Sequence, residues 1–251
     1  MNNIRNILIA HRGESFDASE NTLASVNLAW DKNVKAVEVD LRLSKDNKIV
    51  VIHDATTKRT GKKFSFVNRR TLQELKTLDV GGFKSEKWKG EKIPTLKEML
   101  KTVPTGKKII LEIKCGPEII PILKDEINKS GLKPEQVEIV GFNLSVISKV
   151  KQEIPAQIVL WNHELKNHWW RKTNDRFINK MIVRAKEKNI DGLSLGVRRT
   201  ISEKLILLVK SAGLKIYLWT IDDPAAAKIY FETGVDGIIT NRAALFAEKL
   251  L

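Results

Sequence analysis

The sequence AVEVDLRL, residues 36–43, is the clearest strand signal in the chain. Its Ala, Val and Leu residues predict a buried β-strand, and two carboxylates, Glu38 and Asp40, interrupt the apolar pattern. Because strand side chains alternate between faces, the two carboxylates point to the same side. Burying both would be costly unless a positive charge neutralised them. The stretch therefore predicts a core strand that also carries chemistry.

Similar apolar segments recur along the chain and alternate with helical patterns. We expect the second strand to continue through residues 49–52 after a polar turn at 45–48. The predicted strands are 4–10, 36–52, 108–114, 137–142, 157–161, 192–195, 214–220 and 237–240. The predicted helices are 20–33, 95–102, 118–130, 144–153, 174–189, 202–212, 224–233 and 242–251. Eight such units predict a closed α/β (β/α)8 TIM barrel, whereas an open doubly wound sheet, the alternative, usually has fewer strands.

Residues 54–92 do not fit this alternation, because they are polar and too long for an ordinary connection. We expect them to form a small insertion after the second strand, at the mouth of the barrel. The chain has no low-complexity tract or interdomain linker, and its 251 residues match the usual length of one barrel. The sequence thus predicts a single TIM-barrel domain over residues 1–251, with an inserted segment at about 54–92.

Composition limits the possible functions. The net charge is +14, with 44 Lys and Arg against 30 Asp and Glu, which favours an anionic partner. No recognised nucleic-acid motif accompanies this charge, and we expect no nucleic-acid partner. No apolar run approaches the 20 or so residues that cross a bilayer, and the N-terminal apolar stretch is too short for a secretion signal. One cysteine, Cys115, is typical of a reducing compartment, so we expect a cytoplasmic protein.

Ionisable residues follow the first three predicted strands, where the chemistry of such barrels collects. They are His11 and Arg12 after the first, Glu38 and Asp40 in the second, His53 after its continuation, and Glu112 and Lys114 at the end of the third. Three converging carboxylates suit a hard divalent cation, Mg²⁺ or Ca²⁺. Two histidines suit general acid/base work, and the two cations suit an anionic oxygen such as phosphate. Glu112 and Lys114 could instead simply pair with each other.

The motifs around these ionisable residues resemble those of a known family. His11-Arg12-Gly13, Glu20-Asn21-Thr22, Glu38-Val39-Asp40 and His53-Asp54 resemble the signature of the glycerophosphodiester phosphodiesterases. Weaker matches continue in the same order to the Gly-Val-Asp-Gly-Ile-Ile-Thr run at 234–240. The resemblance implies a (β/α)8 barrel with an insertion after the second strand. It also implies hydrolysis of a glycerophosphodiester to sn-glycerol 3-phosphate and an alcohol.

The resemblance implies a role for each matching residue. Metal ligation falls to Glu38, Asp40 and Glu112, and acid/base catalysis to His11 and His53. The phosphoryl oxygens would be bound by Arg12 and Lys114. The site would be supported by Glu20 and Asn21, and the substrate pocket would be lined by Phe142 and Trp219. Two positions depart from the family pattern: Ser19 stands where Pro is frequent, and Asn241 stands where Asp is frequent. Any charge-dependent role at the second position is therefore in doubt.

Two other functions remain open. A lysophospholipase D-like activity on the same scaffold would share these residues and differ in the pocket, for which Trp169, Trp170 and the Phe64–Phe66 region offer apolar side chains. A basic protein that binds nucleic acid or membranes is the less favoured alternative. The positive charge is concentrated in residues 55–92, with 11 Lys and Arg against 4 Asp and Glu, and in residues 163–189, with 8 against 3. We expect these segments to attract anionic phosphodiesters, and to make transient contact with an anionic membrane surface.

Overall fold

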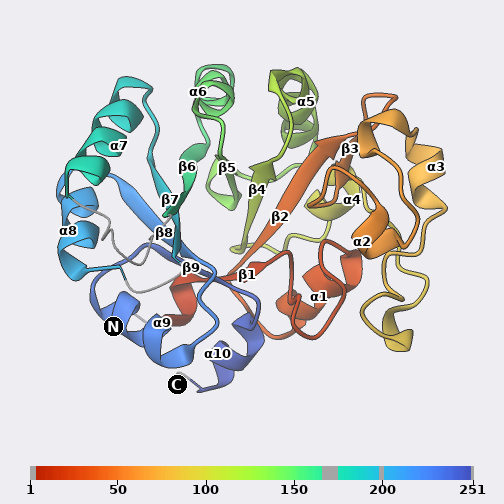
Figure 1. Cartoon of the computed structure of the whole chain (residues 1–251), viewed down its shortest axis with the longest axis horizontal. Coiled ribbons are helices and arrows are strands. Elements are labelled where there is room, and N and C mark those ends of the chain that lie inside the picture. Colours follow the sequence, from red (N-terminus) through yellow and green to blue (C-terminus); the bar gives the residue numbers. More distant parts are fainter. Residues whose placement is uncertain (1–3, 166–174, 198–200, 250–251) are drawn as a thin grey trace.

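Eight parallel strands form a closed barrel, which confirms the predicted fold (Figure 1). The computed structural model describes residues 4–165, 175–197 and 201–249. The barrel closes because β1 pairs with both β2 and β9. Its strands are β1 (Leu8–His11), β2 (Ala36–Leu43), β4 (Lys108–Ile113), β5 (Val137–Gly141), β6 (Ile158–Leu165), β7 (Gly192–Val197), β8 (Lys215–Trp219) and β9 (Gly237–Thr240).

Helices surround the strands and cover their outer faces (Figure 1). They are α1 (Leu23–Asp31), α4 (Leu96–Leu100), α5 (Ile120–Lys129), α6 (Leu144–Glu153), α7 (Asp175–Glu187), α8 (Glu203–Ser211), α9 (Pro224–Glu232) and α10 (Ala243–Lys249). A large apolar core lies between helices and strands, and a smaller cluster fills the barrel itself: Ile9, Ala36, Ile110, Val140, Leu160, Tyr217 and Ile239. The barrel is therefore packed, and its polar residues are displaced toward its ends. Among the described residues, no helix has both the length and the apolar character needed to cross a membrane.

The predicted continuation of the second strand is wrong. Residues 49–52 do not extend the second strand; they turn back as β3 (Ile49–Val51), which pairs antiparallel with β2. The reversal occurs at the predicted polar turn, where Asn47 has a φ of 55° that Asn tolerates better than most residues. β3 lies outside the barrel, so the eight barrel strands do not include it.

The first predicted strand is also too long. Residues 4–7 form a 3-10 turn, η1 (Ile4–Ile7), and β1 begins at Leu8. Ile4 is buried in that turn, and a short apolar run does not by itself distinguish a buried turn from a buried strand. At β6 the error is the reverse: the predicted strand ends at residue 161, whereas β6 runs to Leu165 and includes His163.

The segment between β3 and α4 forms its own small structure. It contains α2 (Lys58–Gly61), η2 (Val67–Arg69), α3 (Leu72–Lys76) and η3 (Glu86–Trp88). A separate apolar cluster holds it together: Val50, Ile52, Val67, Leu75, Val80 and Ile93. Thr71 caps α3 and Thr95 caps α4, each through a reciprocal capping box with the Glu three residues later. The chain then returns beside β3, because the Val51 N–H donates to the Pro94 carbonyl at 2.8 Å.

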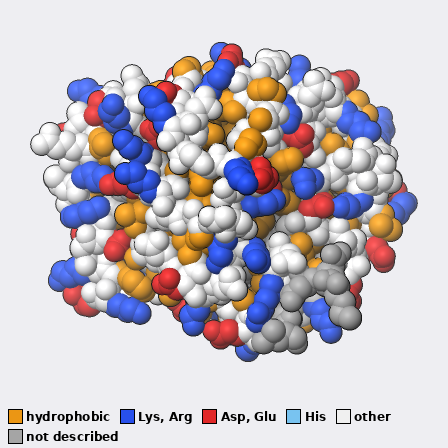
Figure 2. Space-filling model, turned by 180° about the vertical axis from the view of Figure 1, so that it is seen from behind, with side chains coloured by type: hydrophobic (Ala, Val, Ile, Leu, Met, Phe, Trp, Pro, Cys, Tyr) orange, Lys and Arg blue, Asp and Glu red, His pale blue; other side chains and the backbone are white. Residues whose placement is uncertain are grey.

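Lys and Arg side chains are spread over the surface. On the face drawn in Figure 2 they are interspersed with fewer acidic side chains, and apolar atoms show between them. On this face, therefore, the positive charge is not gathered into one patch.

Candidate active site

Three buried carboxylates, Glu38, Asp40 and Glu112, meet at one end of the barrel. The register of the sheet brings them together, because Asp40 lies beside Glu112 on the neighbouring strand and Glu38 lies beside His11. One oxygen of each carboxylate lies within 4.8 Å of the others. Burial, followed by repulsion from Asp40 and Glu112, raises the pKa of Glu38 well above its ordinary value. Protein groups therefore leave this cluster short of positive charge.

The chemistry of the cluster fits a divalent cation. Glu38 Oε1 is buried and has no hydrogen-bond partner, which is costly for a carboxylate oxygen. Carboxylate oxygens are the ligands that Mg²⁺ and Ca²⁺ prefer. Glu38, Asp40 and Glu112 could therefore hold such an ion.

Two cations border the cluster. Lys114 Nζ lies 2.6 Å from Glu112 Oε1 and 3.2 Å from Asp40 Oδ1, so Lys114 is not paired with Glu112 alone. Arg12 Nε lies 3.3 Å from Asp40 Oδ2, and the backbone N–H of Arg12 donates to Glu38 Oε2 at 3.1 Å. Burial alone would raise the pKa of Asp40, but the positive charges of Lys114 and Arg12 hold that pKa below its usual range. The end of the barrel thus combines acidic groups with two nearly buried cations, which suits a phosphoryl group and a metal ion side by side.

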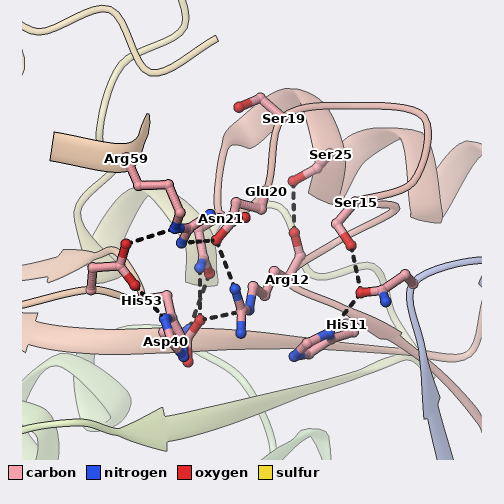
Figure 3. A network of polar contacts seen from close by, with 12 residues as sticks. His11, Arg12, Ser15, Ser19, Glu20, Asn21, Ser25, Asp40, His53 and Arg59 are labelled. Atoms are coloured by element: carbon pink, nitrogen blue, oxygen red, sulfur yellow. Dashed lines mark hydrogen bonds and ion pairs between the residues drawn. The ribbon is translucent and has the colours of Figure 1, made fainter. Parts of the chain in front are cut away.

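The loop after β1 positions Arg12 and Asn21. Both residues have left-handed backbone conformations, with φ of 56° and 58°, and the Asn21 N–H donates to the Arg12 carbonyl. The Asn21 side chain donates from Nδ2 to Asp40 Oδ2 and accepts from the Asp40 N–H, so it fixes that carboxylate (Figure 3). Glu20 accepts from Arg12 NH1 at 2.9 Å. The predicted supporting residues therefore contact one metal-ligand candidate and one phosphate-binding candidate.

His11 is held by Asn241, on the loop that follows β9. Asn241 Nδ2 donates to Asp222 Oδ2, which turns Oδ1 toward His11 Nδ1 at 2.7 Å. Since an amide oxygen only accepts, Nδ1 of His11 carries the proton and Nε2 presents a lone pair. Nε2 lies 4.0 Å from Glu38 Oε2. Burial and then Arg12 lower the pKa of His11 to about 4.

His53 follows β3 and has a different partner. Its Nδ1 lies 2.7 Å from Asp54 Oδ1, and Asp54 Oδ2 accepts from Arg59 Nε at 2.7 Å. Burial lowers the pKa of His53, and Asp40 and Asp54 act against that shift. A carboxylate on Nδ1 fixes the ring and leaves Nε2 available. The two histidines therefore reach the site with the same ring nitrogen free.

Phe142 and Trp219 form an aromatic wall. Their ring centroids are 5.8 Å apart in an edge-to-face arrangement, and Lys114 Nζ lies 5.4 Å from the centre of the Phe142 ring. Phe142 follows β5 and is exposed, whereas Trp219 ends β8. The wall therefore extends the site away from the carboxylates across the barrel.

Four contributors were not predicted as site residues: Arg42, Asp54, Arg59 and Asn241. Arg42 donates to the carbonyls of His53 and Lys114 and so joins two site segments. Asp54 stands in the His53-Asp54 motif, and Asn241 follows a strand end, so position alone could have suggested both. No sequence signal marks Arg59, since its partners are brought near by the fold of the insertion. Trp169 and Trp170 lie outside the described residues.

Comparison with known proteins agrees with this geometry. The profile of the glycerophosphoryl diester phosphodiesterase family matches residues 11–245. A glycerophosphodiester phosphodiesterase of Caldanaerobacter subterraneus is 31% identical over 244 residues, which cover 95% of each chain.

Solved structures agree as well. A phosphodiesterase of Oleispira antarctica, solved in complex with the product sn-glycerol-3-phosphate, superposes with a TM-score of 0.86 at 27% identity, covering 96% of this chain and 95% of that one. A glycerophosphodiester phosphodiesterase of Thermotoga maritima superposes with a TM-score of 0.76 at 25% identity, covering 96% and 97%. The similarity extends over essentially the whole barrel and its insertion.

Proposed function

Since the chain belongs to the glycerophosphoryl diester phosphodiesterase family, whose members are phosphoric diester hydrolases, we propose that it hydrolyses glycerophosphodiesters to sn-glycerol 3-phosphate and an alcohol, with one divalent cation and two histidines. The observation that carries this proposal is the buried cluster of Glu38, Asp40 and Glu112 beside Arg12 and Lys114. The expected ion is Mg²⁺ or Ca²⁺. The phosphodiester is a small anionic substrate, which the two cations suit.

When bound at the three carboxylates, the cation would supply positive charge that polarises the phosphodiester. Arg12 and Lys114 stabilise the negative charge that the phosphoryl oxygens gain in the transition state. Of His11 and His53, one takes the proton of the oxygen that bonds to phosphorus, and the other gives a proton to the alkoxide oxygen whose bond to phosphorus breaks, so that it leaves as the alcohol. Their fixed ring orientations leave Nε2 free in each ring: the base accepts a proton on this nitrogen as a neutral imidazole, and the acid gives one from it as an imidazolium.

Product release is the direct test. Purified protein is incubated with glycerophosphocholine or glycerophosphoethanolamine, with Mg²⁺, Ca²⁺ or EDTA, and sn-glycerol 3-phosphate is measured. We expect release with a divalent ion and none with EDTA. If neither substrate yielded product with either ion, the proposed reaction would be wrong.

The histidine roles have their own test. His11→Ala and His53→Ala should each lower kcat by about 100-fold or more, the usual contribution of an acid or base, while metal binding measured by calorimetry persists. Near-full activity in either variant would refute the role given to that histidine.

A lysophospholipase D-like activity is the second candidate, and one observation favours it. Phe64 and Phe66 on the insertion are 60% and 40% exposed, with ring centroids 5.5 Å apart, and Arg69 lies over the Phe66 ring. Such an apolar pair beside a cation suits an acyl chain or an anionic lipid surface. Choline release from lysophosphatidylcholine faster than from glycerophosphocholine would establish this alternative. Equal sedimentation of wild type and Phe64→Ser/Phe66→Ser with phosphatidylglycerol vesicles would exclude a lipid contact at this pair.

A further inference from the structure

Arg59 lies in the insertion and binds two carboxylates at once. Its Nε donates to Asp54 Oδ2 at 2.7 Å, and its two terminal nitrogens donate to the two oxygens of Glu20 at 2.6 and 2.8 Å. Figure 3 shows the Arg59 guanidinium beside Glu20, above Asp40. Asp54 belongs to the segment after β3, and Glu20 to the loop after β1. One side chain of α2 therefore joins two segments that come from different strands.

Each of these carboxylates also accepts a hydrogen bond from a residue of the proposed site. Asp54 Oδ1 accepts from His53 Nδ1 at 2.7 Å. Glu20 Oε1 accepts from Arg12 NH1 at 2.9 Å, and Arg12 continues to Asp40. A displacement of Arg59 would therefore release the partners of both His53 and Arg12.

The geometry requires a guanidinium. Arg59 uses all three of its nitrogens, one on Asp54 and two on Glu20, whereas a Lys ammonium is a single point charge on a flexible stem. Arg59 is 43% exposed, so solvent weakens these ion pairs as a source of stability. Arg59 therefore contributes more to fixing the orientations of Asp54 and Glu20 than to stabilising the fold.

We propose that Arg59 is a positioning residue for the hydrolysis: it holds Asp54 and Glu20 together, and these carboxylates in turn fix the His53 ring and the Arg12 guanidinium beside the metal-ligand cluster. The inference rests on the proposed function, since it assigns a part in that reaction. It also gives the insertion a role in the site, because Arg59 of α2 links the loop after β1 to the segment after β3.

The kinetic experiment compares Arg59→Ala, Arg59→Lys and a matched control, Arg70→Ala. Arg70 lies in the same insertion, is 45% exposed and pairs with Glu74 and Ser65, away from the site. Loss of such supporting contacts typically costs about 10- to 100-fold in activity, and we expect that loss of kcat in Arg59→Ala at an almost unchanged Tm. Added guanidinium should restore part of the rate to Arg59→Ala and none to Arg70→Ala. Arg59→Lys should remain well below wild type.

Three results would overturn the proposal: wild-type kcat in Arg59→Ala, full activity in Arg59→Lys, or equal losses in Arg59→Ala and Arg70→Ala. A second readout needs no turnover. The ¹⁵N spectrum of the four histidines, with His53 assigned through His53→Ala, should show the Nδ1–H of His53 bound to Asp54 in wild type and Arg70→Ala and altered in Arg59→Ala. An unchanged His53 signal would refute the bridge even if the protein hydrolysed no glycerophosphodiester. Absence of turnover in wild type, by contrast, would count against the proposed function alone.

Discussion

The Trp219 ring rests on Gly196, which lies beside it on the neighbouring strand: a Cβ at position 196 would lie 2.6 Å from the ring. No side chain fits at that distance, so Gly196 sets the place of the aromatic wall that Trp219 forms with Phe142.

Gly196→Ala should therefore displace Trp219 and raise the KM for glycerophosphocholine several-fold, with an overpacking cost of about 1–3 kcal/mol in unfolding free energy. Steady-state kinetics and urea unfolding measure the two effects. Gly61→Ala is the control, because its Cβ would meet its nearest neighbour at an ordinary 3.4 Å. An unchanged KM in Gly196→Ala would show that the wall does not contact substrate.

Glu38→Gln should separate metal binding from folding. In wild type, a saturating divalent ion should raise Tm, since 100-fold excess over Kd adds about 2.7 kcal/mol to the stability. The variant should lose that increase, while its Tm in EDTA should not fall, because the substitution removes a carboxylate that Asp40 and Glu112 repel. Differential scanning calorimetry with and without Mg²⁺ or Ca²⁺ measures both. A full metal-induced increase in the variant would remove Glu38 from the ligand set.

Glu14 should make stability depend on pH. It is buried, it accepts from the Ala244 N–H at 2.8 Å, and burial is the main cause that raises its pKa from 4.5 to about 7. Between these values the folded state binds more protons than the unfolded state, so this contribution to stability is complete below pH 4.5 and is lost as the pH rises through 7. The loss is about 3 kcal/mol at most.

Glu14→Gln has no titrating proton at this position, so its unfolding free energy should rise relative to that of wild type as the pH increases from 5 to 8. Urea unfolding at both pH values measures the difference between the two proteins. A difference that stays constant across this range would contradict the shifted pKa.

Asn241→Asp should shift the pH profile of the enzyme. The new carboxylate would face His11 Nδ1 and would replace the amide that donates to Asp222. A negative charge at this distance favours the protonated imidazole, so the pKa of His11 should rise above its low value of about 4. If neutral His11 is the active form, the acidic limb of kcat/KM against pH should move upward, and an identical profile in the variant would count against that requirement.

Salt should reveal electrostatic attraction of substrate. If the basic segments draw substrate to the site, kcat/KM should fall with added NaCl at fixed metal concentration, because ions screen the field within about 8–10 Å at 0.1–0.15 M. The effect should be larger for glycerophosphoglycerol, which has a net negative charge, than for the zwitterion glycerophosphocholine. Equal salt responses for the two substrates would argue against attraction.

The barrel could be predicted because its signals are local. The apolar runs from Ala36–Leu43 to Gly237–Thr240 and the helices between them follow from short periodic patterns. The direction of β3 could not be predicted in the same way. An apolar run at 49–52 is compatible with both a continued and a reversed strand, and only its pairing with Leu41 and Leu43 decides between them.

The convergence of Glu38, Asp40 and Glu112 was predictable from strand alternation and the position of the strand ends. The groups that hold the histidines were harder to predict, because their partners are remote in sequence. Asn241 lies 230 residues from His11, and Arg59 reaches Glu20 across 39 residues through the fold of the insertion. Periodicity describes neighbours along the chain, whereas these contacts depend on how separate loops are folded over one another.

The two ends of the insertion lie side by side, since Val51 bonds to Pro94 and Val50 pairs with Thr95. Because loop closure depends only weakly on length, residues 62–92 could change in length at little entropic cost, provided that Asp54 and Arg59 keep their contacts with His53 and Glu20. An exchange of residues 62–92 with the corresponding residues of a relative would test whether this stretch, which carries the exposed Phe64 and Phe66, influences the choice of substrate.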